Sequence, residues 1–352
     1  MNRNITIGKN SLANTYIIAE MSANHNMDFE RAVKIIYAAK DSGADAIKIQ
    51  TYTADTMTLP CDDDCFQITQ GTLWDGTTLY KLYEKAYTPW EWQDKLKKVA
   101  NDIGLDFFSS PFDFTSVDFL EKMNVPAYKI ASFEITDIPL IRKVARLGKP
   151  VIISTGIATL TDIELAVKTC RDEGNNNIIL LKCCSVYPTP YEDINLKTMV
   201  NLQDTFGCVV GLSDHTMGDA IAVASVAMGA KVVEKHLTLS RADGGVDSAF
   251  SMEPHEFKQM VDNIRIVEKA MGQVTYELTD KQKGEREHAR SLFIVKDMKA
   301  GEVLNGVNMR SVRPANGLHT KYYDELLGKK INRDVKLGTP LSWDLIDFDK
   351  EK

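Results

Sequence analysis

The sequence predicts an α/β fold, namely a parallel (β/α)8 TIM barrel followed by a small C-terminal domain. Eight short runs of apolar and β-branched residues recur between residues 16 and 235, and amphipathic segments separate them. After about residue 285 the pattern changes to short strand-like runs with glycine-containing turns. A doubly wound open sheet is the alternative, but no G-x-G-x-x-G motif follows the first predicted strand. The count of eight strands therefore favours the closed barrel.

The predicted barrel strands are residues 16–20, 46–50, 106–110, 127–131, 151–154, 178–183, 209–212 and 232–235. Between them lie segments such as FERAVKIIYAAKDSG and DIPLIRKVARLGK, in which apolar residues recur three and four positions apart. This period is typical of helices that cover a sheet with one apolar face. Thr115 and Thr161 are predicted N-caps, because hydroxyl side chains satisfy the free amides at a helix start.

Three segments follow from this organisation. A catalytic barrel is predicted over residues 1–275, and a C-terminal domain over 291–352. The stretch LTDKQKGEREHAR gives the region between them, residues 276–290, the polar composition of a linker. A chain of 352 residues is long enough for two such unequal domains.

Composition excludes several classes of protein. The net charge of -7 argues against a nucleic-acid partner, because such proteins carry basic surfaces that neutralise phosphates. No apolar stretch follows the first charged residues and no run of about 18 apolar residues occurs, so neither a secretory signal nor a membrane partner is predicted. The six cysteines show no paired metal-ligand spacing and are too few for a disulfide framework. We therefore expect a cytoplasmic protein with reduced thiols.

Polar residues gather where the predicted strands end, which is where a parallel barrel places its catalytic groups. These residues are Glu20, Lys48, Gln50, Ser109, Ser110, Lys129, Ser132, Glu134, Ser154, Thr155, Lys182, Ser185, Tyr187, Ser213, Asp214, His215, Glu234 and His236. Solubility alone does not explain polar clusters at all eight ends. The pattern therefore predicts an active site at this face of the barrel.

His215 and His236 follow the seventh and eighth strands, which are neighbours in a closed barrel. Side chains alternate along a strand, so Glu234 shares a face with His236. Two imidazoles with carboxylates nearby suit a catalytic divalent ion, Mn²⁺ before Mg²⁺ or Co²⁺, with positions left open for water and substrate oxygen. The alternative for each histidine is a packed, hydrogen-bonded side chain.

Lys48 and Lys129 lie inside the otherwise apolar runs AIKIQ and AYKIAS, where an unpaired charge is costly. Together with the serines at the strand ends they predict a site for a phosphate or carboxylate ligand. An internal ion pair with Glu20 is one alternative. A Schiff-base lysine is another, because a buried lysine with a lowered pKa can be a nucleophile.

The segment GTLWDGTTLYKLYEKAYTPWEW holds three of the four tryptophans. Helical spacing in residues 79–86 predicts a helix packed on the core. The turn-rich part around residues 71–76 predicts either more core packing or a lid over the barrel mouth.

Successive motifs of the sialic acid synthase family are similar to segments of this chain, in the same order: IAEMSANHN, AIKIQTY, FFSSPFD, YKIASFE, ISTGIAT, LKCCSVYPTP, GLSDHT and EKHLTL. The C-terminal segment resembles the antifreeze-like (SAF) domain of that family, and SVRPANGL stands where those proteins carry a sugar-contacting arginine. Within the family, the tryptophan-rich segment resembles the members that make pseudaminic acid rather than those that make N-acetylneuraminate.

The resemblance implies a metal-dependent condensation of phosphoenolpyruvate with an open-chain amino sugar, 2,4-diacetamido-2,4,6-trideoxy-L-altrose. His215 and His236 would hold the metal. The catalytic residues would be Glu134 as the acid/base group, Ser132 beside it, Lys48 near the reacting sugar, and Tyr187. Phosphoenolpyruvate would bind to Lys129, Ser110, Ser154, Ser185 and Ser213, and the sugar to Glu20, Tyr187, Asp247 and Arg313. Arg313 would reach the partner's active site in a domain-swapped homodimer.

Two residues depart from the family pattern. Ser110 replaces a threonine but keeps the hydroxyl, and Asp247–Ser248 stands where neuraminate synthases carry Asp-His. The sugar contacts there should therefore differ. An N-acetylneuraminate or legionaminate synthase is the alternative within the family, and a Schiff-base aldolase or a non-catalytic sugar-acid binding module is the alternative outside it.

Overall fold

The computed structural model describes residues 5–8 and 10–348. It forms two compact units, of which the first ends at Gly272 and the second begins at Gln273. The predicted barrel ends at residue 275, close to that boundary. Residues 1–4 and 349–352, which the predicted domains include, lie outside the described residues together with Lys9.

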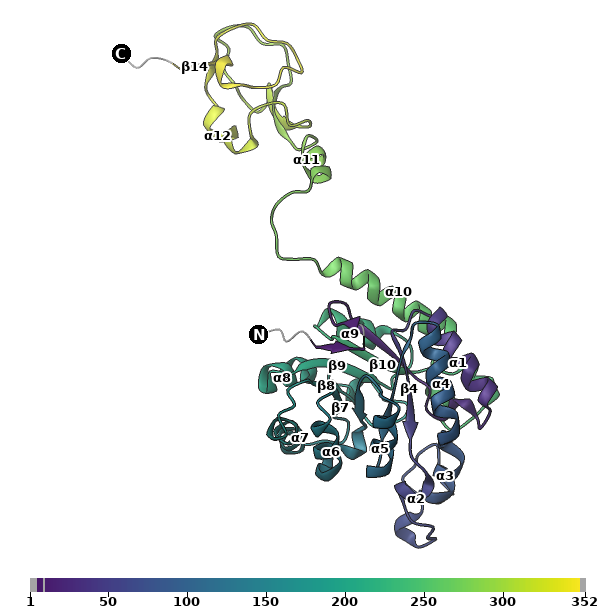
Figure 1. The fold of residues 1–352 in the computed structure, drawn as a ribbon. Helices are drawn as coiled ribbons and strands as arrows, with labels where there is room; N and C mark the ends of the chain where they lie inside the picture. Colours follow the sequence, from purple (N-terminus) through teal and green to yellow (C-terminus); the bar gives the residue numbers. More distant parts are fainter. Residues whose placement is uncertain (1–4, 9, 349–352) are drawn as a thin grey trace. The chain divides into compact units, whose positions relative to one another are not determined.

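Eight parallel strands close into a barrel in the first unit, which confirms the predicted fold (Figure 1). They are β3 (Tyr16–Glu20), β4 (Ala46–Thr51), β5 (Asp106–Pro111), β6 (Tyr128–Ile130), β7 (Val151–Ser154), β8 (Ile178–Lys182), β9 (Val209–Asp214) and β10 (Val232–His236). Each pairs with its neighbour in the chain, and β10 pairs with both β9 and β3. A short hairpin, β1 (Thr6–Ile7) with β2 (Asn10–Ser11), precedes the barrel.

Four strands run further than predicted: β4 and β5 by one residue each, to Thr51 and Pro111, and β9 and β10 into polar residues. β9 continues through Asp214 and β10 through His236, because Ser213 and Asp214 pair in register with Glu234 and Lys235. Polar residues can continue a buried strand when their side chains find partners, and a hydropathy pattern does not show such partners. The last residues of β9 and β10 are therefore polar and still paired in the sheet.

Helices cover the outside of the barrel (Figure 1). They are α1 (Phe29–Asp41), α4 (Trp90–Asp102), α5 (Phe114–Lys122), α6 (Ile138–Arg146), α7 (Leu160–Asp172), α8 (Lys197–Phe206), α9 (Ala220–Ala227) and α10 (Pro254–Met271), while the shorter α2 (Ala54–Met57) and α3 (Leu79–Ala86) lie between β4 and α4. The predicted caps Thr115 and Thr161 are wrong by two residues. Asp113 and Thr159, in extended backbone, accept hydrogen bonds from the first amides of α5 and α7.

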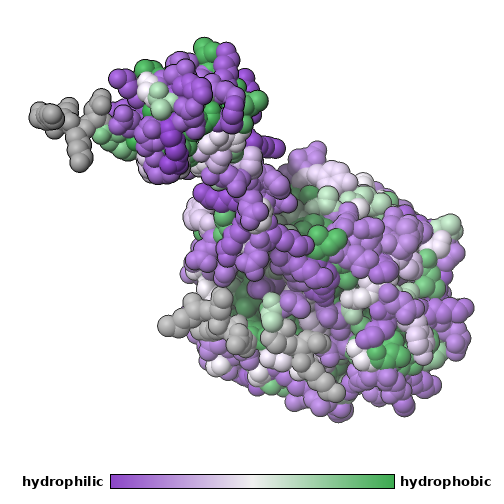
Figure 2. Space-filling model, turned by 90° about the horizontal axis from the view of Figure 1, so that it is seen from above, coloured by the Kyte–Doolittle hydropathy of each residue, from purple (hydrophilic) through white to green (hydrophobic). Residues whose placement is uncertain are grey.

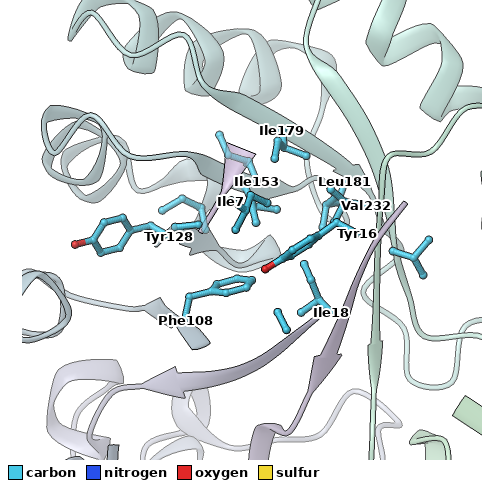
Figure 3. Packing of buried hydrophobic residues seen from close by; sticks show 14 of the residues in the cluster. Ile7, Tyr16, Ile18, Phe108, Tyr128, Ile153, Ile179, Leu181 and Val232 are labelled. Carbon is cyan, nitrogen blue, oxygen red and sulfur yellow. The ribbon is translucent and has the colours of Figure 1, made fainter. Parts of the chain in front are cut away.

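The barrel and its helices share one large apolar core. Figure 3 shows part of it, where Tyr16 and Ile18 of β3 lie near Phe108 of β5 and Val232 of β10. All five residues of β3 are buried, as expected for a parallel strand between a packed interior and a helical layer. The core fixes the strands, and so fixes the side chains at their C-terminal ends.

The second unit contains α11 (Asp280–Arg286), β11 (Ser291–Ile294), β12 (Met309–Val312), α12 (Tyr323–Leu326), β13 (Lys330–Ile331) and β14 (Ile346–Asp347). β11 pairs with β12 and β13 with β14, both antiparallel, around a small apolar cluster of its own. Helix α11 lies inside the region predicted as a polar linker. Its capping box at Thr279 and Gln282 explains why a short polar segment forms a helix there.

Hydrophilic residues dominate the face of the molecule that Figure 2 shows, and the hydrophobic patches on that face are small. Within the described part of the chain, none of the helices is long and apolar enough to cross a membrane.

Candidate active site

Two adjoining cavities lie at the C-terminal ends of the barrel strands. The inner cavity has a volume of about 50 Å³ and is polar, whereas the outer cavity has a volume of about 520 Å³. Gln50, Ser132, Tyr187 and His236 line both of them. One binding region therefore combines a small charged end with a wider chamber.

Buried charges of both signs line the inner cavity. The Lys48 ammonium lies 2.6 Å from Glu20 and 3.6 Å from Glu234, and the Lys129 ammonium lies 3.7 Å from Glu234. Burial disfavours the charge of Lys48, but Glu20 and Glu234 outweigh it and raise the pKa of Lys48. Burial lowers the pKa of Lys129, because Glu234 compensates it only in part. The ion pair with Glu20, an alternative from the sequence, does form, and Glu234 links the two lysines.

Hydroxyl groups surround these lysines. Lys48 donates to Ser110 Oγ at 3.3 Å, and Ser213 donates to Glu234 at 3.5 Å. The Oγ atom of Ser154 is buried with no hydrogen-bond partner among the described residues. Ser185 lies beside Gly156, where a Cβ atom would come within 2.2 Å of its Oγ. A buried donor without a partner costs free energy unless a ligand or water satisfies it.

The two predicted metal ligands lie side by side, with ring centroids 5.4 Å apart. His215 Nδ1 lies 2.9 Å from the carbonyl oxygen of Cys184, so Nδ1 carries the proton and Nε2 keeps its lone pair. His236 Nδ1 is buried and has no hydrogen-bond partner among the described residues. Burial lowers the pKa of His215 to about 4 and that of His236 well below its usual value, so both rings are neutral at pH 7.

Neutral imidazoles with free lone pairs fit a divalent metal ion. Among the described residues, no group of three or more His, Cys, Asp or Glu is placed to hold a metal. The protein thus offers a pair of nitrogen ligands here, and further coordination would come from water or substrate oxygen.

Glu134 and Ser132 belong to a 3-10 turn that follows β6, Ser132–Thr136. Ser132 Oγ accepts a hydrogen bond from the Ile157 amide at 3.0 Å, which ties this turn to the segment after β7. One carboxylate oxygen of Glu134 is buried without a partner among the described residues. Burial raises the pKa of Glu134 to about 7, against the attraction of Lys129. A carboxyl group with this pKa can both accept and donate a proton near neutral pH.

A chain of hydrogen bonds runs from the inner cavity to the outer one. Gln50 donates to Glu20 at 3.1 Å and to Ser22 Oγ at 3.0 Å, and Ser22 Oγ donates to Asp247 at 2.5 Å. Burial raises the pKa of Asp247, although the bond from Ser22 opposes this shift. Polar groups that can contact hydroxyls therefore line one side of the outer cavity.

Apolar and aromatic side chains form the remaining wall of the outer cavity, including Trp74, Tyr83, Phe112 and Phe250. The Trp74 indole donates to the Val246 carbonyl at 3.0 Å, and its ring lies 5.7 Å from that of Tyr187. The turn-rich part around residues 71–76 therefore contributes Thr72 and Trp74 to the wall of the outer cavity, which favours the lid alternative over simple core packing. Helix α3 lines the same chamber instead of packing only on the core.

The structure brings most of the predicted site residues together. Nine line the inner cavity: Glu20, Lys48, Lys129, Ser132, Ser154, Tyr187, Ser213, His215 and His236. Glu134 and Asp247 line the outer one. Ser110 and Ser185 line neither of them, and Arg313 lies exposed in the second unit.

The sequence places Glu234 on the same face as His236, but its contacts with Lys48 and Lys129 were not predicted. No role was predicted for Ser22 or Trp74. Ser22 and Trp74 lie in irregular segments, where no periodicity predicts the direction of a side chain.

Comparisons with known proteins identify the family of this chain. Residues 289–347 match the model of the SAF domain. A pseudaminic acid synthase of Helicobacter pylori is 47% identical, with 94% of this chain and 97% of that protein covered, and one of Campylobacter jejuni is 48% identical, covering 93% and 95%. The crystal structure of an N-acetylneuraminic acid synthetase from Leptospira borgpetersenii, in complex with citrate, is similar with a TM-score of 0.71 and 30% identity, covering 80% of this chain and 95% of that one. Residues 35–276 match the model of the NeuB family, and with relatives this similar over nearly the whole chain, the protein belongs to the NeuB family.

Proposed function

We propose that this enzyme condenses phosphoenolpyruvate with 2,4-diacetamido-2,4,6-trideoxy-L-altrose and water, giving pseudaminic acid and phosphate. One observation carries the proposal: a small cavity with two buried lysines and two neutral histidines opens into a larger chamber with apolar walls. The relatives at 47% and 48% identity are pseudaminic acid synthases, whereas the neuraminic acid synthetase is 30% identical.

The inner cavity suits phosphoenolpyruvate. Lys129 would attract its phosphate or carboxylate, and the hydroxyls of Ser154 and Ser213 would donate hydrogen bonds to it. Ser110 and Ser185, next to this cavity, would complete the set after small side-chain rotations. An anion here would satisfy the buried Oγ of Ser154, which has no partner among the described residues.

The chemistry then needs one nucleophilic attack and one addition of water. Carbon 3 of phosphoenolpyruvate attacks the aldehyde carbon of the sugar, and positive charge develops at carbon 2. Water adds to carbon 2, and Glu134 accepts its proton and passes it to the former aldehyde oxygen, which becomes a hydroxyl group. The tetrahedral intermediate then loses phosphate, which takes the proton of the new hydroxyl at carbon 2, to leave the 2-keto acid. Lys48 and Lys129 stabilise the negative oxygens near the reacting carbons. His215 and His236 would hold the divalent ion, Mn²⁺ in our proposal, which when bound supplies Lewis-acid polarisation of the aldehyde.

The outer chamber suits the altrose derivative. This sugar carries two acetamido methyl groups and a methyl group at carbon 6, and the aromatic wall of Trp74, Tyr83 and Phe250 offers apolar contacts for them. Asp247 and Gln50 lie on the polar side, where they would contact hydroxyl groups. N-acetylmannosamine has one acetamido group and a 6-hydroxyl, so it would leave part of this wall uncovered.

We place the reaction in the cytoplasm, because all six cysteines are free thiols, as a reducing compartment favours. The resemblance to family members with a SAF domain supports a domain-swapped homodimer in which Arg313 contacts the sugar at the partner's site.

Oxygen labelling of phosphoenolpyruvate tests the proposed reaction course. With ¹⁸O at the bridging oxygen on carbon 2, the label should appear in the released phosphate, and mass spectrometry of the sugar product should show pseudaminic acid. Retention of the label in the keto acid would mean attack of water on phosphorus and would contradict this mechanism. Borohydride trapping of pyruvate on Lys129 would support the Schiff-base alternative instead.

A further inference from the structure

We propose that the ion pair between Lys235 and Asp214 positions the two histidines at the metal site, an inference that rests on the proposed function for the metal itself. The Lys235 ammonium lies 2.6 Å from Asp214 Oδ2 and donates to the Thr216 carbonyl at 2.7 Å. Asp214 Oδ1 accepts a hydrogen bond from the Thr216 amide at 2.9 Å. Through these contacts Lys235, the residue before His236, holds Asp214 and Thr216, the two residues on either side of His215.

The pair lies behind the cavity and not inside it. Side chains alternate along a strand, so Asp214 and Lys235 point away from the face that carries Ser213 and Glu234. Neither Asp214 nor Lys235 lines either of the two cavities at the barrel mouth. The pair can therefore act on substrate or metal only through His215 and His236, its neighbours in the sequence. Its role is one of positioning.

Positioning explains this pair better than stability does. Lys235 is 2% exposed and Asp214 is 1% exposed, so both charges have lost their water. A buried ion pair often contributes little net stability, because the cost of desolvation offsets the attraction. Its defined geometry can still fix one register and one orientation, and here it joins the ends of β9 and β10, from which both histidines project.

His236 has particular need of such support. Metal-binding histidines usually donate their second ring nitrogen to a carboxylate or carbonyl, which sets the orientation of the ring. His215 has that partner in the Cys184 carbonyl, whereas His236 Nδ1 has none among the described residues. Apart from its ring contacts with His215 and Phe250, the orientation of His236 thus depends on the backbone of β10, which Lys235 anchors at the preceding residue.

Mn²⁺ binding to the full-length protein, followed by electron paramagnetic resonance without phosphoenolpyruvate or sugar, tests this role. We compare Lys235→Met, Asp214→Leu and the double variant with the wild type. Each single variant should lose stability, because it leaves one buried charge without its partner. The double variant should regain much of the thermal midpoint, yet bind Mn²⁺ about tenfold to a hundredfold more weakly, as loss of an outer-shell partner predicts.

A less buried ion pair, near the N-terminal end of strand β4, supplies the control. Arg265 lies 3.1 Å from Asp45, the residue before β4. Arg265→Met should lower the thermal midpoint and leave Mn²⁺ affinity unchanged. Wild-type Mn²⁺ affinity in the double variant, or an equal loss of affinity in Arg265→Met, would overturn the positioning role.

A second measurement separates this inference from the metal assignment. The imidazole NMR signals of His215 and His236, recorded without metal, should broaden or double in the double variant, because their rings are no longer held in one orientation. If the wild type binds no Mn²⁺, the metal part of the proposed function fails. The positioning role then rests on the NMR result, and unchanged imidazole signals would overturn it.

Discussion

At the scale of single residues, burial sets the protonation states on which the proposed reaction depends. Lys48 stays charged because two carboxylates face it, and His215 and His236 stay neutral because their rings are buried. Glu134 differs from both cases, since burial raises its pKa to about 7 and it forms no ion pair with any of the described residues. Burial, together with the charges of neighbouring groups, therefore produces one fixed cation, two neutral ligands and one proton-exchanging carboxyl group.

The pH dependence of kcat tests the role of Glu134. As the base for water addition it must be ionised, so wild-type kcat should fall about tenfold per pH unit below pH 7. Lys129, Asp137 and Tyr83 are the charged or titratable groups that interact electrostatically with it. Glu134→Gln should lower kcat by about 10²- to 10⁴-fold and remove this limb of the profile. An unchanged limb in Glu134→Gln would assign the titration to another group.

At the scale of elements, the close approach of β9 and β10 makes a specific demand at Gly211. A Cβ atom at this position would lie 2.2 Å from the Val232 carbonyl oxygen and 2.8 Å from Leu181 Cδ2. The Val232 carbonyl belongs to the backbone of β10 and cannot move aside as a flexible side chain can. Gly211→Ala should therefore lower the free energy of unfolding by about 1–3 kcal/mol, measured by thermal denaturation. The same change at Gly284, where nothing lies within 4 Å, is the control and should cost little.

The segment that precedes α3 bears on substrate binding. Trp74 closes the outer chamber through its bond to Val246 and its contact with Tyr187. Trp74→Ala should raise the KM for the sugar roughly tenfold and leave the KM for phosphoenolpyruvate unchanged, since an aromatic contact contributes up to about 1.5 kcal/mol. Leu73→Ala, a neighbouring change at a 53% exposed residue, should alter neither KM value. Equal changes in both KM values for Trp74→Ala would contradict a chamber reserved for the sugar.

Much of the barrel could be predicted from the sequence, because parallel strands are apolar and their carboxyl ends must converge. For this reason the sequence predicted four of the residues at the barrel mouth, Lys48, Lys129, His215 and His236. Apart from the pair of Lys48 with Glu20, the partners of these side chains could not be predicted, since pairing depends on neighbouring strands and not on local pattern. The link from Glu234 to both lysines and the pair of Lys235 with Asp214 are of this kind.

At the scale of the whole molecule, the chain combines a catalytic barrel with a separate SAF domain. The domain-swapped homodimer that we propose requires each site to contain residues from two subunits. Mixing inactive Arg313→Ala and His236→Ala variants, after dissociation and reassembly, should restore about a quarter of wild-type turnover, because half of the dimers are mixed and each holds one complete site. No recovery in demonstrably mixed dimers would contradict the contribution of Arg313 from the partner.

The most direct test of the central claim is phosphate release from phosphoenolpyruvate by the purified protein with Mn²⁺. The assay offers 2,4-diacetamido-2,4,6-trideoxy-L-altrose and N-acetylmannosamine in parallel, each with and without chelator. We predict release with the altrose derivative, little with N-acetylmannosamine, and none after chelation. Release with N-acetylmannosamine alone would contradict the proposed substrate, and undiminished release in the presence of chelator would contradict the metal-dependent mechanism.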